Sequence, residues 1–237
     1  MNEMKELSWD THFFGFGVGK VIAHNLTSKL LEKIIQQMKD HNYKLVYCFV
    51  DPNDSLSNKS LKAENFELVD EKVTYVMGII ENEKKLPSNI NSIINNPINE
   101  KLLSLALLSG EYSRFKIDKH FPRHTLERLY KKWLENSLNR EIAKDVLVYI
   151  EDDKEVGFLT LGEKNRRADI GLLAVNKYYR GKGIGTKLIH SACYIASKMN
   201  FTQIQVVTQK SNEGACIFYE KVGFTKDRID NIYHIWL

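Results

Sequence analysis

The segment from Arg180 to Gly185 contains the residue types of an anion-binding loop. Arginine occupies position 180 and glycine occupies positions 181, 183 and 185, in front of a stretch with helical spacing. Backbone N–H groups at the start of a helix have no intrahelical acceptor, and glycine lets a ligand approach them closely. The positive end of the helix and the guanidinium group both favour negative charge. The sequence therefore predicts that this loop binds a phosphate or a pyrophosphate.

The spacing of the glycines excludes the two common nucleotide-binding loops. A Walker loop requires Gly-Lys followed by Ser or Thr, whereas this segment reads Gly185-Thr186-Lys187. A dinucleotide fingerprint requires G-x-G-x-x-G, which the glycines do not match. What remains is R-x-x-G-x-G, formed by Arg180, Gly183 and Gly185 between an apolar strand and an amphipathic helix.

Over residues 145–237 the sequence resembles the Gcn5-related N-acetyltransferases, the GNAT superfamily. The apolar strand IGLLAV precedes the loop, and a second block, SNEGACIFYEKVGF, follows it with Asn212 before a helix and Tyr219 inside the helix. The resemblance implies the GNAT fold and acyl-CoA (coenzyme A) as co-substrate, with no metal. It also implies that the chain is an acyl-CoA-dependent N-acyltransferase.

The resemblance also implies the roles of individual residues. Arg180 and the loop amides would hold the pyrophosphate of coenzyme A, the preceding strand would pair with the pantetheine arm, and Tyr219 would be the catalytic residue. The cofactor-binding residues predicted in this way are Leu173, Val175, Arg180, Gly181, Lys182, Gly183, Ile184, Gly185, Thr186 and Asn212. The alternatives are that Tyr219 is a packing aromatic and Arg180 a solvated surface residue.

Acyl transfer from a thioester requires a donor for the oxyanion, an unprotonated amine and a proton for the departing thiolate. A backbone N–H near Leu172 or Leu173 suits the first role, and the hydroxyl of Tyr219 suits the last. No carboxylate stands out as the general base, and a water chain is an equal alternative. The carboxylates considered are Asp10, Asp51, Glu111, Asp118 and Glu163.

Apolar periodicity predicts the elements that position these residues. The second half contains a helix in 124–143, strands at 146–152, 157–163 and 168–175, a helix at 186–200, a strand at 202–208, a helix at 212–222 and a strand at 231–237. A tight turn is expected at Asp152-Asp153. The order β-β-β-α-β-α-β predicts an α/β (α+β) GNAT fold with a mixed central sheet that contains at least one parallel pair.

The first half is also expected to be α/β. It contains a helix in 28–43, a buried strand at 44–50 and, over 65–79, a pair of strands with a turn at Val69-Asp70-Glu71. A faint internal repeat aligns Phe66 with Phe224 and places Leu61 where the second copy has Tyr219. The first half is therefore interpreted as a degenerate GNAT-like copy.

The polar segment 81–100, which contains two of the four prolines, is interpreted as the domain boundary. Residues 1–100 are expected to form an N-terminal α/β domain that contributes to acceptor binding. Residues 101–237 are expected to form the GNAT acyl-CoA-binding catalytic domain.

The segments LSWDTHFFGF and SRFKIDKHFP resemble the subgroup of dTDP-fucosamine (dTDP-amino-dideoxy sugar) N-acetyltransferases. This resemblance implies a dTDP-linked amino sugar as acceptor, for cell-surface polysaccharide biosynthesis, and an acetyl or a longer or hydroxylated acyl group. The predicted substrate-binding residues are Asp10, Phe13, Phe14 and Arg114, with a phenylalanine stacking on thymine and Arg114 neutralising the diphosphate. The alternatives are a GNAT acetyltransferase for a protein N-terminus or another small amine, and a non-catalytic acyl-CoA-binding module.

Composition narrows the range of partners. The net charge of +4 comes from basic residues spread along the chain, which argues against a nucleic-acid partner. Cys48, Cys193 and Cys216 form no C-x-x-C pattern, so reduced thiols are expected. No signal peptide and no apolar stretch long enough for a bilayer are found, which predicts a cytoplasmic protein with no membrane partner. The apolar C-terminal strand at 231–237 is expected to be exposed and to suit a homodimer.

Overall fold

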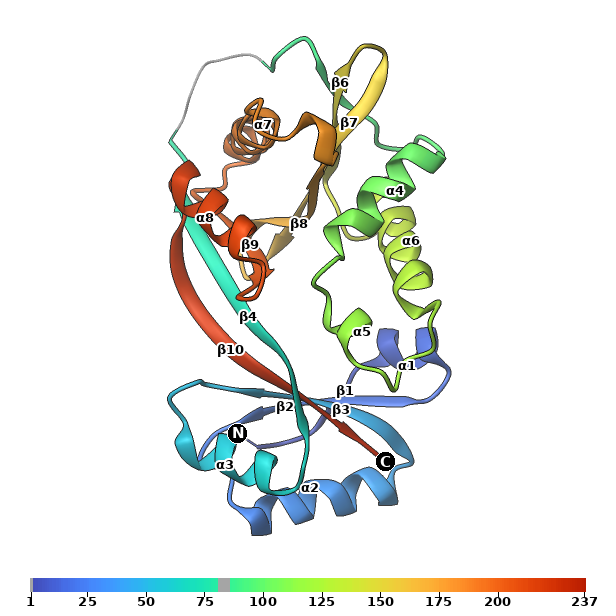
Figure 1. Ribbon diagram of the computed structural model, residues 1–237, viewed down its shortest axis with the longest axis vertical. Coiled ribbons are helices and arrows are strands. Elements are labelled where there is room, and N and C mark those ends of the chain that lie inside the picture. Colours follow the sequence, from blue (N-terminus) through green and yellow to red (C-terminus); the bar gives the residue numbers. More distant parts are fainter. Residues whose placement is uncertain (1, 81–85) are drawn as a thin grey trace. The chain divides into compact units, whose positions relative to one another are not determined.

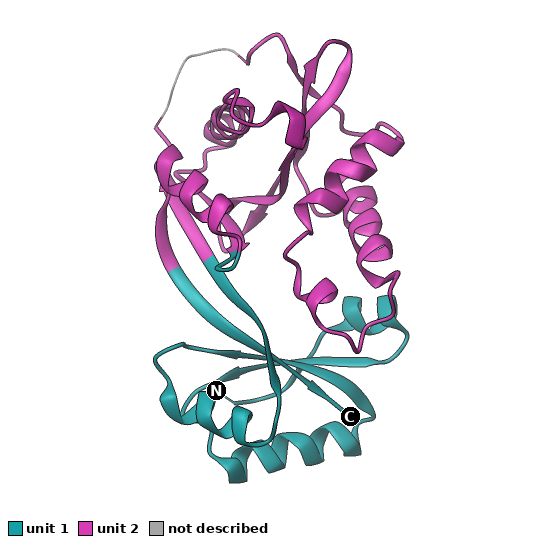
Figure 2. Cartoon of the chain, in the orientation of Figure 1, with its two compact units in different colours: residues 1–73, 209–211, 228–237 teal, residues 74–208, 212–227 magenta. Residues whose placement is uncertain are grey.

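The computed structural model describes residues 2–80 and 86–237 of the 237-residue chain. By its internal contacts the chain forms two compact units, coloured separately in Figure 2. Unit 1 comprises residues 1–73, 209–211 and 228–237, and unit 2 comprises residues 74–208 and 212–227. Residues 81–85 of the predicted boundary segment lie outside the described residues, and the predicted domains 1–100 and 101–237 stay a prediction. The predicted contribution of residues 1–100 to acceptor binding stays a prediction.

Unit 1 is a small sheet backed by helices. Its elements are β1 (Lys5–Glu6), α1 (Ser8–Phe14), β2 (Gly17–Ala23), α2 (Ser28–Asp40), β3 (Tyr43–Val50), α3 (Ser55–Ala63) and parts of β4 (Glu67–Gly78) and β10 (Thr225–Trp236). The strand order is β1-β2-β3-β10-β4, with β2 parallel to β3 and β10 antiparallel to β3. Helix α2 begins where Thr27 accepts a hydrogen bond from the Leu30 amide, and it buries Leu31, Ile34 and Met38.

Unit 2 contains the remaining elements, shown in Figure 1. They are β5 (Ile90–Ser92), α4 (Glu100–Ser109), α5 (Arg114–Ile117), α6 (Thr125–Leu138), β6 (Asp145–Glu151), β7 (Lys154–Lys164), β8 (Arg167–Val175), the 3-10 helix η1 (Lys177–Tyr179), α7 (Ile184–Lys198), β9 (Gln203–Gln209) and α8 (Glu213–Val222). The strand order is β4-β9-β8-β7-β6-β5. Strands β6, β7 and β8 form an antiparallel meander, and β8 runs parallel to β9.

The predicted order β-β-β-α-β-α-β is confirmed from β6 to β10, and so is the expected parallel pair. Asp152 and Asp153 both have positive φ, as a tight turn between β6 and β7 requires. Figure 1 shows α7 on one face of this meander and the α4–α6 pair on the other. Leu102 and Leu134 pack with Val146 and Phe158 on the second face. The meander is thus held rigidly between two helical layers.

Residues 67–78 form the single continuous strand β4, so the predicted turn at Val69-Asp70-Glu71 is wrong. The segment contains no positive φ that would reverse the chain. Asp70 is only 7% exposed, and the Nζ of Lys210 lies 2.7 Å from a carboxylate oxygen of Glu71. The charges that suggested a turn are therefore the polar positions of one long strand.

The C-terminal strand is not exposed at a sheet edge, so that expectation is also wrong. Strand β10 lies between β3 and β4, and Ile232, Tyr233 and Ile235 are fully buried. A strand with neighbours on both sides offers no backbone groups to a second copy. The predicted homodimer therefore loses the feature on which it was based.

The faint internal repeat is visible in the order of the elements. The series β2-α2-β3-α3-β4 has the same order as β8-α7-β9-α8-β10, and each series begins with a parallel pair. The final strands are exchanged, because β10 pairs with β3 and β4 neighbours β9. Each half of the repeat is therefore completed by a strand from the other half.

No helix within the described residues is long and apolar enough to cross a membrane. Cys48 is buried, whereas Cys193 and Cys216 are partly exposed, and all three are free thiols.

Candidate functional site

The parallel strands β8 and β9 separate partway along their length. Their ladder pairs Ala168 with Ile204, Asp169 with Gln205 and Ile170 with Val206, and it ends there. Both strands continue, β8 as far as Val175 and β9 as far as Gln209. The β9-facing edge of residues 171–175 is therefore open for pairing with another extended chain.

The predicted pantetheine-binding residues Leu173 and Val175 lie on this open segment. On their other side they pair with β7, where Leu173 lies opposite Leu159 and Val175 lies opposite Gly157. Because β7 fixes one edge of β8, the other edge is held ready for a ligand without further folding.

A β-bulge lies at the point where β8 leaves β9. The register between β7 and β8 shifts there, and the amide of Leu172 donates a 2.8 Å hydrogen bond to Oγ1 of Thr160. A Cβ on Gly171 would lie 2.9 Å from the same oxygen, so the bulge requires glycine at this position. Of the two amides predicted as oxyanion donors, that of Leu172 already has an acceptor. The amide of Leu173 is the remaining candidate.

Glycine is required at the positions after β8 for different structural reasons. Gly181 and Gly183 have φ values of +81° and +74°, in the left-handed region that side chains with a Cβ rarely adopt. Gly183 is also the N-cap residue of α7. A Cβ on Gly185 would lie 2.8 Å from Cζ of Phe218, so this glycine lets α8 pack closely on the first turn of α7.

The amides of the loop point to an anion. None of the backbone N–H groups of residues 181–186 donates to an acceptor within the described part of the chain, and the first amide bond of α7 is that of Lys187 to Gly183. These groups precede or begin a helix of 15 residues, whose dipole adds positive potential. The predicted loop residues Gly181, Ile184 and Thr186 all lie in this row of amides, which suits a pyrophosphate.

The cationic side chains of the loop are held by protein groups in this structure. Nε of Arg180 donates to the Val175 carbonyl over 3.1 Å. Nζ of Lys182 lies 2.7 Å from Oε1 of Glu151, and this hydrogen bond raises the pKa of Lys182. Both side chains are exposed and flexible enough to exchange these partners for a phosphate. The predicted contacts of these two side chains with a pyrophosphate stay predictions.

Asn212 and Tyr219 both lie at α8 but have different surroundings. Oδ1 of Asn212 accepts from the Ala215 amide over 3.3 Å, so Asn212 is the N-cap residue of the helix. Tyr219 is 6% exposed, and its ring packs against Tyr75 and Phe224 at centroid distances of 5.9 and 5.8 Å. Burial raises the pKa of Tyr219, with a further contribution from Cys216, so the phenol stays protonated and able to donate.

The predicted acceptor-binding residues belong to different units. Asp10, Phe13 and Phe14 lie on α1 in unit 1, where the ring of Phe13 stacks on Trp9 at 5.2 Å. Oδ1 of Asp10 accepts from the Tyr47 hydroxyl over 3.2 Å. Arg114 is the first residue of α5 in unit 2. The structure therefore brings the three α1 residues together and assigns Arg114 to the other unit.

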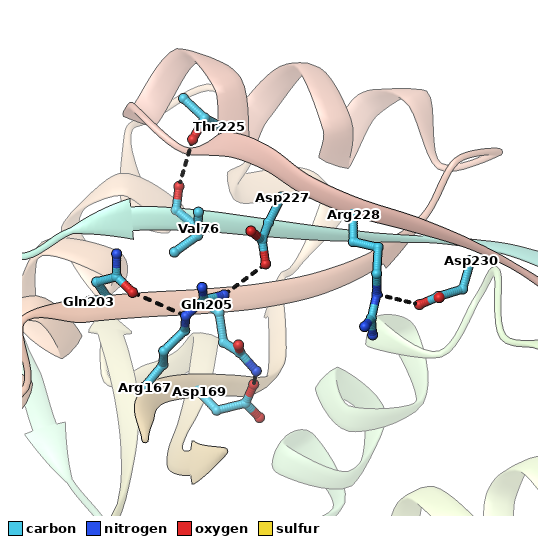
Figure 3. Close-up of polar contacts among 9 residues, drawn as sticks. All are labelled: Val76, Arg167, Asp169, Gln203, Gln205, Thr225, Asp227, Arg228 and Asp230. Atoms are coloured by element: carbon cyan, nitrogen blue, oxygen red, sulfur yellow. Dashed lines mark hydrogen bonds and ion pairs between the residues drawn. The ribbon is translucent and has the colours of Figure 1, made fainter. Parts of the chain in front are cut away.

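One candidate, Asp169, was missed by the sequence reasoning. Arg167 and Asp169 alternate along β8 with Ala168 and Ile170, which are buried on the opposite face of the sheet. Figure 3 shows Oδ1 of Asp169 accepting from Nε2 of Gln205, a 2.7 Å hydrogen bond across the parallel ladder. Asp169 is adjacent to Ile170, the last β8 residue of the ladder, so its carboxylate lies beside the opening.

The signal for Asp169 is a single carboxylate inside the otherwise apolar run ADIGLLAV. Such a residue is unfavourable in a strand that is buried on both faces, so its presence indicates a polar environment. The end of the β8–β9 ladder, which lies next to Asp169, can be seen only in the structure.

Within the described residues, no group of three or more His, Cys, Asp or Glu side chains is placed to hold a metal ion.

Comparison with known proteins agrees with this geometry. Residues 143–226 match the family model described as acetyltransferase (GNAT) domain. The spore coat polysaccharide biosynthesis protein SpsD of Bacillus subtilis (strain 168) is 26% identical over 137 residues, which are 58% of this chain and 47% of SpsD. N-alpha-acetyltransferase 30 of Xenopus laevis is 38% identical over 63 residues, which are 27% of this chain and 23% of that protein. The chain thus spans about half or less of the length of these two relatives.

Among solved structures, a GCN5-related N-acetyltransferase from Sphaerobacter thermophilus has a TM-score of 0.62 at 15% identity. The match covers 92% of this chain and 73% of that chain. At this identity the likeness shows the fold, which is the mixed α/β GNAT fold predicted from the sequence.

We predict that replacing Gly183 by Val weakens coenzyme A binding about tenfold. A β-branched residue in a left-handed conformation costs ~1–2 kcal/mol, which corresponds to roughly that factor in Kd. Calorimetric titration with coenzyme A measures the change. Gly78→Ala is the matched control, because a Cβ there meets nothing within 4 Å and φ is not left-handed. Equal affinities of the Gly183→Val variant and the native chain would contradict the assignment of the loop.

Proposed function

We propose, from the premise that residues 143–226 belong to the acetyltransferase (GNAT) domain family, that this chain is an acyl-CoA-dependent N-acyltransferase. The observation that carries the proposal concerns the described part of the chain. There the loop amides have no acceptor, and they follow a strand edge that has no partner. Together they match the two halves of the co-substrate, a pyrophosphate and an extended chain of amides. The acyl-CoA supplies the thioester carbonyl that the amine attacks.

The residues of the chain divide the binding of the co-substrate between them. The amides of residues 181–186 hold the pyrophosphate, and Arg180 and Lys182 add charge after leaving Val175 and Glu151. Leu173 and Val175 hold the pantetheine arm by backbone pairing. Asn212 shapes this end of the site mainly as the N-cap of α8.

Acyl transfer then needs groups that handle charge and protons. The Leu173 amide is the donor for the oxygen of the reacting carbonyl, because the Leu172 amide is engaged by Thr160. Tyr219 gives its proton to the departing thiolate. Burial raises the pKa of Tyr219, so the phenol carries its proton at neutral pH.

Asp169 is the proposed general base for the attacking amine, directly or through one water. The hydrogen bond from the buried Gln205 fixes one carboxylate oxygen, and the position next to the ladder end brings the group to the opening. Asp169 is thus proposed as the general base in place of the five carboxylates considered from the sequence, which are Asp10, Asp51, Glu111, Asp118 and Glu163.

The proposed acceptor is the amine of a dTDP-linked amino-dideoxy sugar, for cell-surface polysaccharide biosynthesis. Phe13 and Phe14 on α1 offer flat surfaces that suit thymine, and Asp10 offers an acceptor for a ligand hydroxyl or amine. The pairing of Arg114 with the diphosphate stays a prediction from the sequence. The similarity to SpsD, whose name refers to spore coat polysaccharide, supports this class. The similarity to N-alpha-acetyltransferase 30 favours a protein N-terminus as the second candidate. The cytoplasmic location stays a prediction from the sequence.

We predict that the chain releases free coenzyme A from acetyl-CoA when a dTDP-amino sugar is supplied. A panel of dTDP-amino sugars, amino-terminal peptides and simple polyamines, read by thiol release and by mass spectrometry of the product, separates the candidates. Release with peptides alone would move the function to the second candidate. Binding of coenzyme A without turnover on any amine would contradict an enzymatic role.

We predict that Tyr219→Phe lowers kcat by roughly 10²- to 10⁴-fold, the range typical of a positioned proton donor. The Kd for coenzyme A should remain within about twofold, because the ring and its packing are kept while only the departing thiolate loses its proton donor. Steady-state kinetics and calorimetry measure the two quantities. Phe218→Leu is the neighbouring control, since it changes packing on the same helix without removing a hydroxyl. Unchanged turnover in Tyr219→Phe would remove this residue from the mechanism.

We predict that Asp169→Asn lowers kcat/KM by about 10²-fold at neutral pH, with a deficit that shrinks as pH rises. Asparagine still accepts the Gln205 hydrogen bond, so the loss reports the proton-accepting carboxylate, and higher pH supplies more unprotonated amine directly. A pH–rate profile measures this change. Glu163→Gln is the control, because this carboxylate on β7 is exposed and paired with Lys144 at 3.5 Å. A constant ratio to the native rate at every pH would rule out the base.

A further inference from the structure

We propose that Tyr75 is a positioning residue that fixes the side chain of Tyr219 in the orientation required for proton donation. This inference rests on the proposed function, because it concerns the residue that serves as the acid there. Tyr75 lies on β4 and Tyr219 on α8, far apart in the sequence, and both belong to unit 2.

Tyr75 is anchored at both ends of its side chain. The residue is completely buried, and its ring packs on the Tyr219 ring with centroids 5.9 Å apart and planes inclined by 43°. Its hydroxyl donates to Oε1 of Glu220 over 3.0 Å. Glu220 follows Tyr219 directly in the sequence, so Tyr75 contacts two consecutive residues of α8.

The contact is reinforced around the hydroxyl of Tyr75. Nζ of Lys226 on β10 lies 2.9 Å from Oε1 of Glu220, which keeps that carboxylate charged and in place. Cys216, one turn before Tyr219 and Glu220, also contributes to raising the pKa of Tyr75, after burial. The titratable groups that face Tyr75 are thus Cys216, Tyr219 and Glu220 from α8, with Lys226 behind Glu220.

The internal repeat provides a reference for this contact. In the repeat, Tyr233 on β10 corresponds to Tyr75 on β4. Tyr233 is fully buried, and its hydroxyl donates a 2.9 Å hydrogen bond to Oδ1 of Asn58 on α3. Asn58 corresponds to Cys216 and Leu61 corresponds to Tyr219, at the same spacing along the chain. Both halves therefore use a tyrosine to join the exchanged strand to a helix.

Only the contact of Tyr75 lies beside a residue with a proposed catalytic role, Tyr219. In unit 1 the tyrosine meets a neutral amide, and the helix carries a leucine where an acid would be. In unit 2 it meets a carboxylate held by a lysine, and its ring lies against Tyr219. A charged acceptor fixes a hydroxyl more firmly than a neutral one. The hydroxyl of Tyr75 beside Tyr219 is therefore held more firmly than the hydroxyl of Tyr233 in unit 1.

The test is a double-mutant cycle between Tyr75→Phe and Tyr219→Phe. In the native background, Tyr75→Phe should lower kcat about tenfold while the Kd for coenzyme A changes less than twofold, because a misplaced acid weakens chemistry and not binding. In the Tyr219→Phe background, the same change should lower kcat by less than twofold. Equal effects in both backgrounds would overturn the proposal.

Tyr233→Phe is the matched control. It removes the corresponding hydroxyl in unit 1, so it should lower the melting temperature comparably to Tyr75→Phe and leave kcat within about twofold. If both variants lower kcat in proportion to their loss of stability, Tyr75 has a structural role only and the proposal is wrong.

A crystal structure of the Tyr75→Phe variant separates this proposal from the proposed function. Displacement or multiple conformations of the Tyr219 ring are expected whatever the acceptor is. A Tyr219 ring in its native position would overturn the positioning role even if the chain transfers acyl groups. Absence of turnover in the native chain with every amine would instead defeat the proposed function.

Discussion

The end of the parallel ladder between β8 and β9 is the constraint on which the rest of the site depends. Strand β8 needs a partner on each edge to satisfy its backbone groups. Beyond Ile170, β7 is its only partner among residues 2–80 and 86–237. The unpaired edge, the bulge at Gly171 and the glycine loop follow one another along a few residues. An extended ligand that ends in a pyrophosphate satisfies all of them at once. The loop alone would attract any phosphate, whereas the loop beside an open strand edge selects a ligand with both parts.

Sequence reasoning found the features that are local. The loop spacing of Arg180, Gly183 and Gly185, the N-cap at Asn212 and the order of the elements are written in short stretches, because turn and capping chemistry acts over a few residues. It failed where neighbours are distant in the sequence. The charges at Asp70 and Glu71 were interpreted as a turn, because the strand that pairs there comes from the far end of the chain. Asp169 was overlooked for the same reason, since its role depends on where the ladder with β9 ends.

The exchange of final strands explains why the two halves depend on each other. Strand β10, which ends the second half, completes the sheet of the first, and β4, which ends the first half, lies next to β9. An exchanged strand must be fixed to a helix that is remote in sequence, and a buried tyrosine with a hydrogen-bonded hydroxyl provides both area and direction. The catalytic half has placed its proposed acid directly beside such a contact. The support for Tyr219 thus comes from the exchange of final strands between the two halves of the repeat.

In the first half of the repeat, the features that correspond to the open strand edge and the unpaired loop amides have partners within the protein. There β2 stays paired with β3 from Gly17 to Ala23, so no strand edge opens. Oδ2 of Asp54 accepts the Asn25 amide at 2.8 Å and Oγ of Ser57 accepts the Leu26 amide at 2.7 Å, so the chain's own side chains fill the amides that precede α2. Burial opposes the ionisation of Asp54, but its hydrogen bonds with Ser57 and Asn25 outweigh this and lower its pKa. The ionised carboxylate of Asp54 therefore accepts an amide that corresponds, in the repeat, to one of the loop amides proposed to hold a pyrophosphate. Helix amides lie beside a parallel pair of strands in both halves, and among the described residues only the loop of the second half leaves these amides without an acceptor.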